Sequence, residues 1–193
     1  GGGTDPQPFA RDPTPDWNPA WSFDDRYIAF YAYRSGNREL WIQPVAGGPA
    51  TQLTSGNSES VFPRFSPDGD EIVYNSRIGG AMDIWIRPAT GGGNARQIKL
   101  GPIAAGYPDW SPDRNWIAFQ ARGRIWRVPV TGGDPTAVSQ LFASRPRWSP
   151  DGQWIHFFRL NTGTGVVDVW RVSADGKKEQ RLTNLEGRQQ GRT

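Results

Sequence analysis

Short runs in which apolar and polar side chains alternate recur along the whole chain. Four of them begin at Ile28, Glu71, Trp116 and Trp154 and read IAFYAY, EIVYNS, WIAFQA and WIHFF. A period of two residues, rich in aromatic and β-branched side chains, is typical of β-strands, whereas an amphipathic helix shows a period of 3.6 residues. No window of 11 residues shows the helical period. The pattern predicts an all-β protein.

Each alternating run belongs to one of four copies of a longer repeat. The copies open on NPAWSFDDRYIAF, FPRFSPDGDEIVY, YPDWSPDRNWIAF and RPRWSPDGQWIHF, which start at Asn18, Phe62, Tyr107 and Arg145. They continue with ELWIQPVAGG, DIWIRPATGG, RIWRVPVTGG and DVWRVSADG and close on TQLT, RQIKL, TAVS and QRLT. The tryptophans of the middle segments, Trp41, Trp85, Trp126 and Trp170, are spaced by 44, 41 and 44 residues. Such spacing indicates a repeat architecture.

One repeat has room for four short strands joined by tight turns. The Ser-Pro-Asp-Gly and Gly-Gly segments supply residues that preset turn dihedral angles or tolerate a positive φ. A unit of about 44 residues with four antiparallel strands is typical of a propeller blade. We therefore predict a β-propeller of four blades, each a four-stranded antiparallel sheet with one innermost strand. In the first blade we expect strands at about 17–21, 27–33, 39–44 and 50–54.

The repeats also set the expected domain limits. We expect the propeller at residues 14–184, between an N-terminal tail of residues 1–13 and a C-terminal tail of residues 185–193, and the blades at about 14–56, 57–101, 102–140 and 141–184. Three arrangements stay open: a compact four-bladed ring, two chains that form a larger ring, or an open stack that joins its neighbours. Tails held by a neighbouring subunit's edge strand would produce a fibre.

The repeat resembles that of the TolB-like β-propeller family. The resemblance rests on aromatic-Ser-Pro-Asp-Gly, Ile-Ala-Phe, Asp-Ile-Trp, Gly-Gly and Leu-Thr, and covers about residues 14–184. It implies a propeller that lies outside the cytoplasm, in the periplasm or secreted. Two turns depart from the pattern, because Asp25 and Arg114 stand where Gly69 and Gly152 stand in the other copies. We expect those two turns to differ from the others.

Composition and charge exclude several classes of protein. The chain has no cysteine, which excludes disulfides and thiolate sites and fits a location outside the cytoplasm. No apolar run approaches the roughly 18 residues of a membrane-spanning helix. The net charge of +3 is divided into −2 for residues 1–100 and +5 for residues 101–193. This small surplus does not indicate a nucleic-acid partner, which favours a dense basic stripe.

The residues that carry chemistry give little support for an enzyme. His156 is the only histidine and aligns with ordinary strand positions, so we interpret it as structural. The recurrent aspartates lie in separate turns, where a carboxylate accepts local backbone N–H bonds and is too far from its equivalents to share a metal ion. These aspartates are Asp24, Asp68, Asp113 and Asp151. We predict no catalytic residue, no cofactor and no metal site.

A binding surface remains as the best-supported function. Arg64, Asp109, Arg145 and Arg147 flank the repeat proline on the expected innermost strands, where they would line the channel or its mouth. Arginine makes up 19 of the 22 basic residues and suits interface ion pairs and stacking on tryptophan. We predict a non-catalytic protein-binding or scaffolding module whose partner is another protein or a second copy. The alternatives are a self-assembling subunit of a secreted fibre and, third, a propeller lyase or hydrolase.

Overall fold

The regular structure of the protein consists of β-strands alone within residues 14–56, 59–78 and 80–185, which the computed structural model describes. The first two sheets are built from β1 (Asp16–Trp21), β2 (Tyr27–Ala32), β3 (Glu39–Pro44), β4 (Thr51–Gln52), β5 (Ser60–Phe65), β6 (Glu71–Ser76), β7 (Asp83–Pro88) and β8 (Arg96–Ile98). The other two are built from β9 (Gly106–Trp110), β10 (Trp116–Ala121), β11 (Arg124–Pro129), β12 (Thr136–Ala137), β13 (Ala143–Trp148), β14 (Trp154–Leu160), β15 (Val167–Ser173) and β16 (Glu179–Arg181). The predicted all-β class is confirmed.

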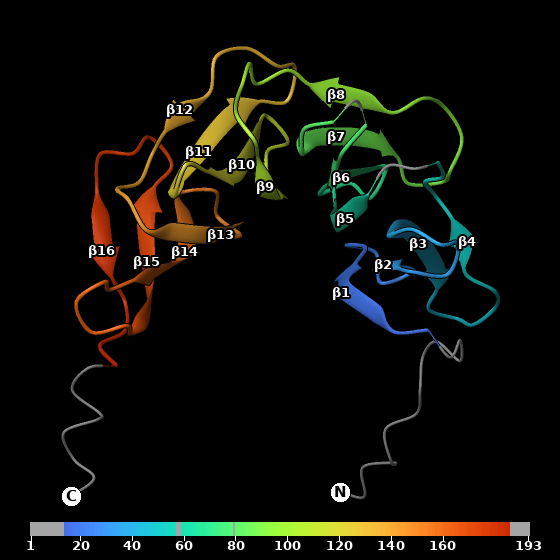
Figure 1. The fold of residues 1–193 in the computed structure, drawn as a ribbon, viewed down its shortest axis with the longest axis horizontal. Helices are drawn as coiled ribbons and strands as arrows, with labels where there is room; N and C mark the ends of the chain where they lie inside the picture. The colour runs from blue at the N-terminus through green and yellow to red at the C-terminus, as the bar shows by residue number, and fades with distance from the viewer. Residues whose placement is uncertain (1–13, 57–58, 79, 186–193) are drawn as a thin grey trace, which may run out of the picture.

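Each sheet is one blade made from four consecutive strands. The strand orders are β1-β2-β3-β4, β5-β6-β7-β8, β9-β10-β11-β12 and β13-β14-β15-β16, and all neighbours are antiparallel. Figure 1 shows the blades along an arc, with β1, β5, β9 and β13 on its inner side. The prediction of four four-stranded blades, each with one innermost strand, is confirmed.

The arc of four blades is open. Figure 1 shows the first and fourth blades at its two ends, far from each other, and successive blades pack together. A single chain thus does not form the compact ring that the sequence left as one possibility. The predicted tails fall outside the described residues, apart from Leu185, and the pairing of tails between chains stays a prediction. Among the described residues, no helix is long and apolar enough to cross a membrane.

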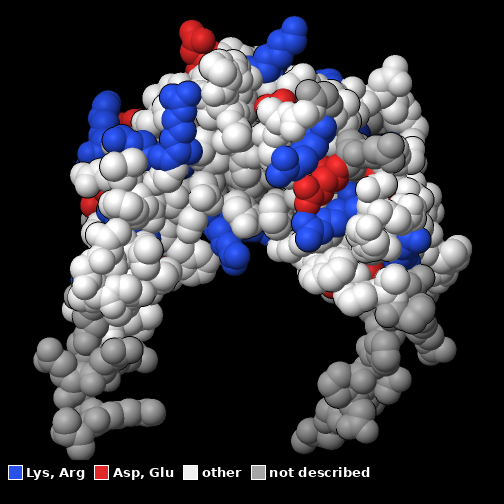
Figure 2. Space-filling model, in the orientation of Figure 1, with Lys and Arg blue, Asp and Glu red and all other residues white. Residues whose placement is uncertain are grey.

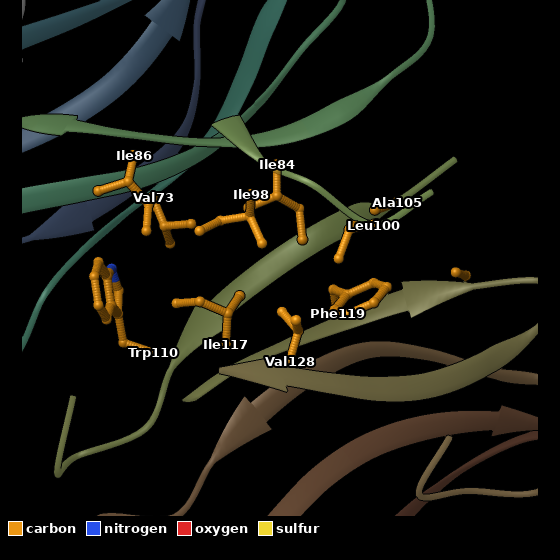
Figure 3. Close-up of a cluster of buried hydrophobic side chains, with 11 residues drawn as sticks. Val73, Ile84, Ile86, Ile98, Leu100, Ala105, Trp110, Ile117, Phe119 and Val128 are labelled. Atoms are coloured by element: carbon orange, nitrogen blue, oxygen red, sulfur yellow. The ribbon is translucent and has the colours of Figure 1, made fainter. Parts of the chain in front are cut away.

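The blades are joined by apolar side chains that project from facing sheets. Figure 3 shows the cluster between the second and third blades. Its buried members are Val73, Ile84, Ile86, Ile98, Leu100, Ala105, Trp110, Ile117, Phe119, Ala121 and Val128. The first and second blades share a cluster around Leu40, Phe65 and Tyr74, and the third and fourth share one around Ala118 and Phe157. Burial of these side chains between sheets is the main stabilising contribution in the molecule.

A serine and an aspartate fix the turn between the first two strands of every blade. In the third blade the Ser111 hydroxyl donates to Asp113 at 2.5 Å and accepts the Trp116 N–H at 2.9 Å. Asp113 also accepts the Asn115 N–H at 3.0 Å. The other blades repeat these bonds, which agrees with the turn role expected for Asp24, Asp68, Asp113 and Asp151. The Ser22 hydroxyl and then the Arg26 backbone lower the pKa of Asp24 to about 2.

The expectation that two of these turns differ is wrong. Asp25 and Arg114 have φ angles of 57° and 63°, close to the 81° and 68° of Gly69 and Gly152. All four residues donate their backbone N–H to the turn serine's carbonyl, at 2.9 to 3.1 Å. The Ser–Asp bonds hold the turn in one conformation, so a residue with a Cβ is forced into the left-handed region that glycine adopts more readily.

Replacing Asp25 with glycine should therefore stabilise the protein. We expect the free energy of unfolding to rise by about 0.5–1 kcal/mol, because glycine removes the steric strain of the positive φ. Urea denaturation of Asp25→Gly measures the change. The matched variant Gly69→Asp, which introduces the same strain into the second blade, should lower the free energy of unfolding by a similar amount. A loss of stability in Asp25→Gly would contradict the explanation.

Candidate functional site

A β-bulge in each innermost strand positions the side chains on the concave side of the arc. The register of β1, β5, β9 and β13 against the second strand of its blade shifts just before or at the repeat proline. The residue before each proline has a positive φ, between 49° and 58°, although none of the four is glycine: Asn18, Phe62, Tyr107 and Arg145. Proline has no N–H to donate to a strand ladder, and a bulge accommodates it. The bulge redirects the residues that follow.

The four innermost strands end around one shared cavity of about 430 Å³. Every blade contributes to its wall. The lining comprises the repeat aromatics Trp21, Phe65, Trp110 and Trp148, the charged residues Arg64, Asp109 and Arg147, and Pro19, Ala20, Phe23, Pro67, Pro112, Ser149 and Pro150. Apolar walls with a few convergent polar groups are typical of binding sites. Of the sequence-predicted binding residues, Arg64, Asp109 and Arg147 thus lie together in this cavity.

The three charged residues form one cluster in which Asp109 lies between two arginines. Asp109 Oδ1 is 3.9 Å from Arg64 Nε and 3.9 Å from Arg147 Nη1. Asp109 Oδ2 accepts the backbone N–H of Trp148 at 2.8 Å, which ties the third blade to the fourth. The three charged residues occupy equivalent positions in the second, third and fourth repeats, directly after the repeat proline. The first repeat has Ala20 at this position. The cavity therefore takes its charges from three successive blades.

Burial changes the pKa values of this cluster. Burial, together with the neighbouring Arg147, lowers the pKa of Arg64 to about 10, so its guanidinium still carries a proton at neutral pH. Burial raises the pKa of Asp109 above its ordinary value of 3.8, and this effect outweighs the opposing influence of Arg147, the Trp148 N–H and Arg64. The side chain of Asp109 is only 14% exposed. Both shifts have the same cause, which is that the cavity separates the charges from water.

Asp109 should make the stability of the protein depend on pH. A folded-state pKa above the unfolded value adds stability below the unfolded pKa, and this contribution is lost as pH rises through the folded pKa. Relative to Asp109→Asn, whose amide does not titrate, the wild-type protein should lose stability as pH rises above about 4. Urea denaturation of both proteins at several pH values measures the difference. Parallel pH profiles, or a wild-type protein that gains stability relative to the variant, would contradict the raised pKa.

Arg145, the fourth predicted binding residue, lies away from the cavity. Its guanidinium sits over the Tyr107 ring, 5.3 Å from the ring centroid, and its backbone N–H donates to Gln120 Oε1 at 3.3 Å. Tyr107 continues a row of aromatic rings through Phe62 and Tyr31 to Trp17, with centroids 4.3 to 5.9 Å apart. The residues before the repeat proline form part of this row. Two of the four repeats have an aromatic residue directly before the repeat proline, Phe62 and Tyr107. This recurrence is the sequence signal from which the row of rings could have been predicted.

The aromatic residues that precede the turn serine differ in burial from blade to blade. Phe65 and Trp110 are buried. Trp21, however, is 54% exposed at the open end of the first blade, where it lines the cavity. A repeat pattern assigns equivalent residues to equivalent positions but does not show which blade lacks a neighbour.

The only histidine lies beside the cavity and not in its lining. His156 is on β14, paired in register with Arg147 and Arg171, and of these three residues only Arg147 lines the cavity. Within the described part of the chain, no three or more His, Asp or Glu side chains gather closely enough to hold a metal ion. The cavity with Arg64, Asp109 and Arg147 is therefore the candidate functional site, and its charged groups suit the binding of a ligand.

Comparison with known proteins decides the family. Residues 3–192 match the family model for the TolB beta propeller domain. The chain belongs to this family. The cavity between the four blades is therefore a feature of a TolB-type propeller.

Individual relatives match parts of this TolB-type propeller. The Tol-Pal system protein TolB of Anaeromyxobacter dehalogenans is 34% identical over 94 residues, which are 48% of this chain and 21% of that protein. Tricorn protease homolog 1 of Streptomyces coelicolor is 29% identical over 107 residues, which are 52% of this chain and 10% of that protein. The chain thus covers about a fifth or less of the length of these two relatives.

Solved structures show the same fold over most of the chain. The structure of a putative TolB from Agrobacterium tumefaciens superposes with a TM-score of 0.73 at 26% identity, covering 90% of this chain and 63% of that one. An oligogalacturonate lyase in complex with manganese superposes with a TM-score of 0.66 at 17% identity, covering 86% and 51%. At this identity the lyase shows only that the fold is shared.

Proposed function

We propose that this TolB-type propeller is a non-catalytic protein-binding module that acts outside the cytoplasm. The observation that carries the proposal is the cavity to which all four innermost strands contribute an aromatic residue and three of them a charged residue. Tryptophan and arginine are among the residue types that contribute most to binding energy at protein interfaces. A mostly apolar wall with three charged groups suits a segment of a protein partner that inserts into the cavity.

The choice of a binding module over an enzyme rests on the composition of the cavity. Its lining contains two arginines, one aspartate and one serine, but no histidine, and the carboxylate is held between cations. Nucleophilic catalysis needs a nucleophile beside a base, and glycoside hydrolysis needs a pair of carboxyl groups. The described residues of the cavity lining supply neither arrangement, which favours binding over hydrolysis. Enzymes among the structural neighbours share the fold at low identity.

The location outside the cytoplasm rests on family membership and on the absence of cysteine from the sequence. Cysteine-free chains need no reducing compartment. The fibre interpretation depends on residues 1–13 and 186–193, which lie outside the described residues, and it stays a prediction.

Peptide selection tests the proposed function. Peptides of about 12 residues selected from a random library on the intact propeller should bind in the cavity. Trp21→Ala should weaken their binding about tenfold or more, because a tryptophan at a cavity mouth is a typical hot spot. The matched control is Tyr33→Ala, which removes an aromatic side chain equally exposed, at 54%, in the same blade but outside the cavity lining. Equal effects of the two substitutions, or no peptide that binds, would overturn the proposal.

A further inference from the structure

The two arginines of the cavity retain most of their hydrogen-bond donors. Arg64 Nη1 donates to the carbonyl of Pro63 at 3.0 Å, and Arg147 Nη1 donates to the carbonyl of Pro146 at 2.7 Å. Within the described residues these are the only hydrogen bonds that the two guanidinium groups make. Each guanidinium has five N–H donors. Asp109 is too distant, at 3.9 Å from each, to accept a hydrogen bond from either.

The cluster also has an excess of positive charge. Two guanidinium groups share the single carboxylate of Asp109, and the second oxygen of that carboxylate is occupied by the Trp148 N–H. Burial is the main cause of the lowered pKa of Arg64, and the like charge of the neighbouring Arg147 lowers it further. Figure 2 shows Lys or Arg atoms at the upper edge of the hollow on the inner side of the arc. An additional anion would relieve this imbalance.

The surroundings restrict the kind of anion that fits. Three tryptophans, two phenylalanines, one alanine and four prolines form nearly all the rest of the wall, so most of the cavity surface is apolar. A small, fully hydrated ion would leave that apolar surface uncovered, whereas a peptide carboxylate brings its own apolar and aromatic neighbours. The planar fork of arginine matches a carboxylate with two parallel hydrogen bonds.

We infer that the protein segment which enters the cavity carries a carboxylate that accepts hydrogen bonds from Arg64 and Arg147, flanked by apolar or aromatic residues that contact the tryptophans. This inference rests on the proposed function and adds to it the chemical class of the partner. The carboxylate comes either from an Asp or Glu side chain or from the carboxyl terminus of the partner chain. Asp109 then acts as a positioning residue, because its carboxylate attracts both guanidinium groups and offsets their mutual repulsion.

A double-mutant cycle tests the inference. Peptides selected on the wild-type propeller are resynthesised with each Asp or Glu replaced by Asn or Gln, and separately with an amidated carboxyl terminus. Loss of the relevant carboxylate should weaken binding to the wild-type protein about tenfold. The same change should have a clearly smaller effect on binding to Arg147→Gln, because one of the two arginines that hold the carboxylate is already absent. If replacement of an Asp or Glu weakens binding, the carboxylate is a side chain. If amidation weakens binding, it is the carboxyl terminus of the partner.

The control variant is Arg96→Gln, which removes an equal charge from a side chain of similar exposure, 44% against 41% for Arg147, on outer strand β8. It should leave the tenfold loss intact. Two results would overturn the inference and leave the proposed function standing, provided that binding depends on Trp21. In the first, removal of the peptide carboxylates does not weaken binding to the wild-type protein. In the second, their removal weakens binding to the wild-type protein and to Arg147→Gln by the same factor. Peptides that do not depend on Trp21 would instead overturn the proposed function itself.

Discussion

Replacing Phe119 with alanine should lower the free energy of unfolding by about 3–5 kcal/mol. Phe119 lies on β10 and is fully buried in the cluster between the second and third blades. Figure 3 shows its ring near Leu100, which follows β8 of the second blade, and near Val128 on β11 of its own blade. The substitution removes the apolar contact and leaves a cavity that two rigid sheets fill only in part.

Urea denaturation followed by tryptophan fluorescence measures this loss. The matched control is Phe23→Ala, because Phe23 is 70% exposed and its removal creates no internal cavity. We expect its effect on stability to stay within about 0.5 kcal/mol. A similar small effect of Phe119→Ala would mean that the blades are stable without packing on each other.

The second large effect is expected at a turn, where Ser111→Ala should cost about 2 kcal/mol. The buried hydroxyl of Ser111 both donates to Asp113 and accepts the Trp116 N–H at the start of β10. Without it, a backbone N–H beside the core loses its acceptor, and an unsatisfied buried group costs more than the bond itself contributes.

The fourth blade offers an internal control for this serine. Ser173 makes the same pair of bonds, with Asp175 and the Lys178 N–H, at an exposed turn between β15 and β16. Water replaces the lost hydroxyl there, so Ser173→Ala should cost less than about 1 kcal/mol. Equal losses in the two variants, measured by urea denaturation, would show that burial does not determine the contribution of this turn.

The sequence was sufficient to predict the blades because local chemistry and repetition agree at every level. Alternation marks the strands, Ser-Pro-Asp marks the turns, and the four copies fix how many sheets there are. Even the first blade's strands lie within about two residues of their expected limits. The positive φ of Asp25 and Arg114 was not predicted, since the repeat's hydrogen bonds impose a conformation against the preference of these two residues.

The site was only partly predictable. Position in the repeat places Arg64, Asp109 and Arg147 on innermost strands, but whether they meet depends on how far successive blades rotate around the arc. The same position in the first blade holds Ala20, and Arg145, two residues before Arg147, turns away at the bulge. The openness of the arc and the exposure of Trp21 are likewise properties of packing between blades, which no single repeat encodes.

The most direct test of binding in the shared cavity is an NMR titration of the ¹⁵N-labelled propeller with a selected peptide, monitored at the tryptophan indole and arginine side-chain N–H signals. Binding there predicts that the largest shifts occur at Trp21, Trp148, Arg64 and Arg147, which line the cavity. The third-strand tryptophans Trp41, Trp85, Trp126 and Trp170 should stay nearly unchanged. Largest shifts at the third-strand set, with unchanged signals from the cavity, would show that the partner binds elsewhere.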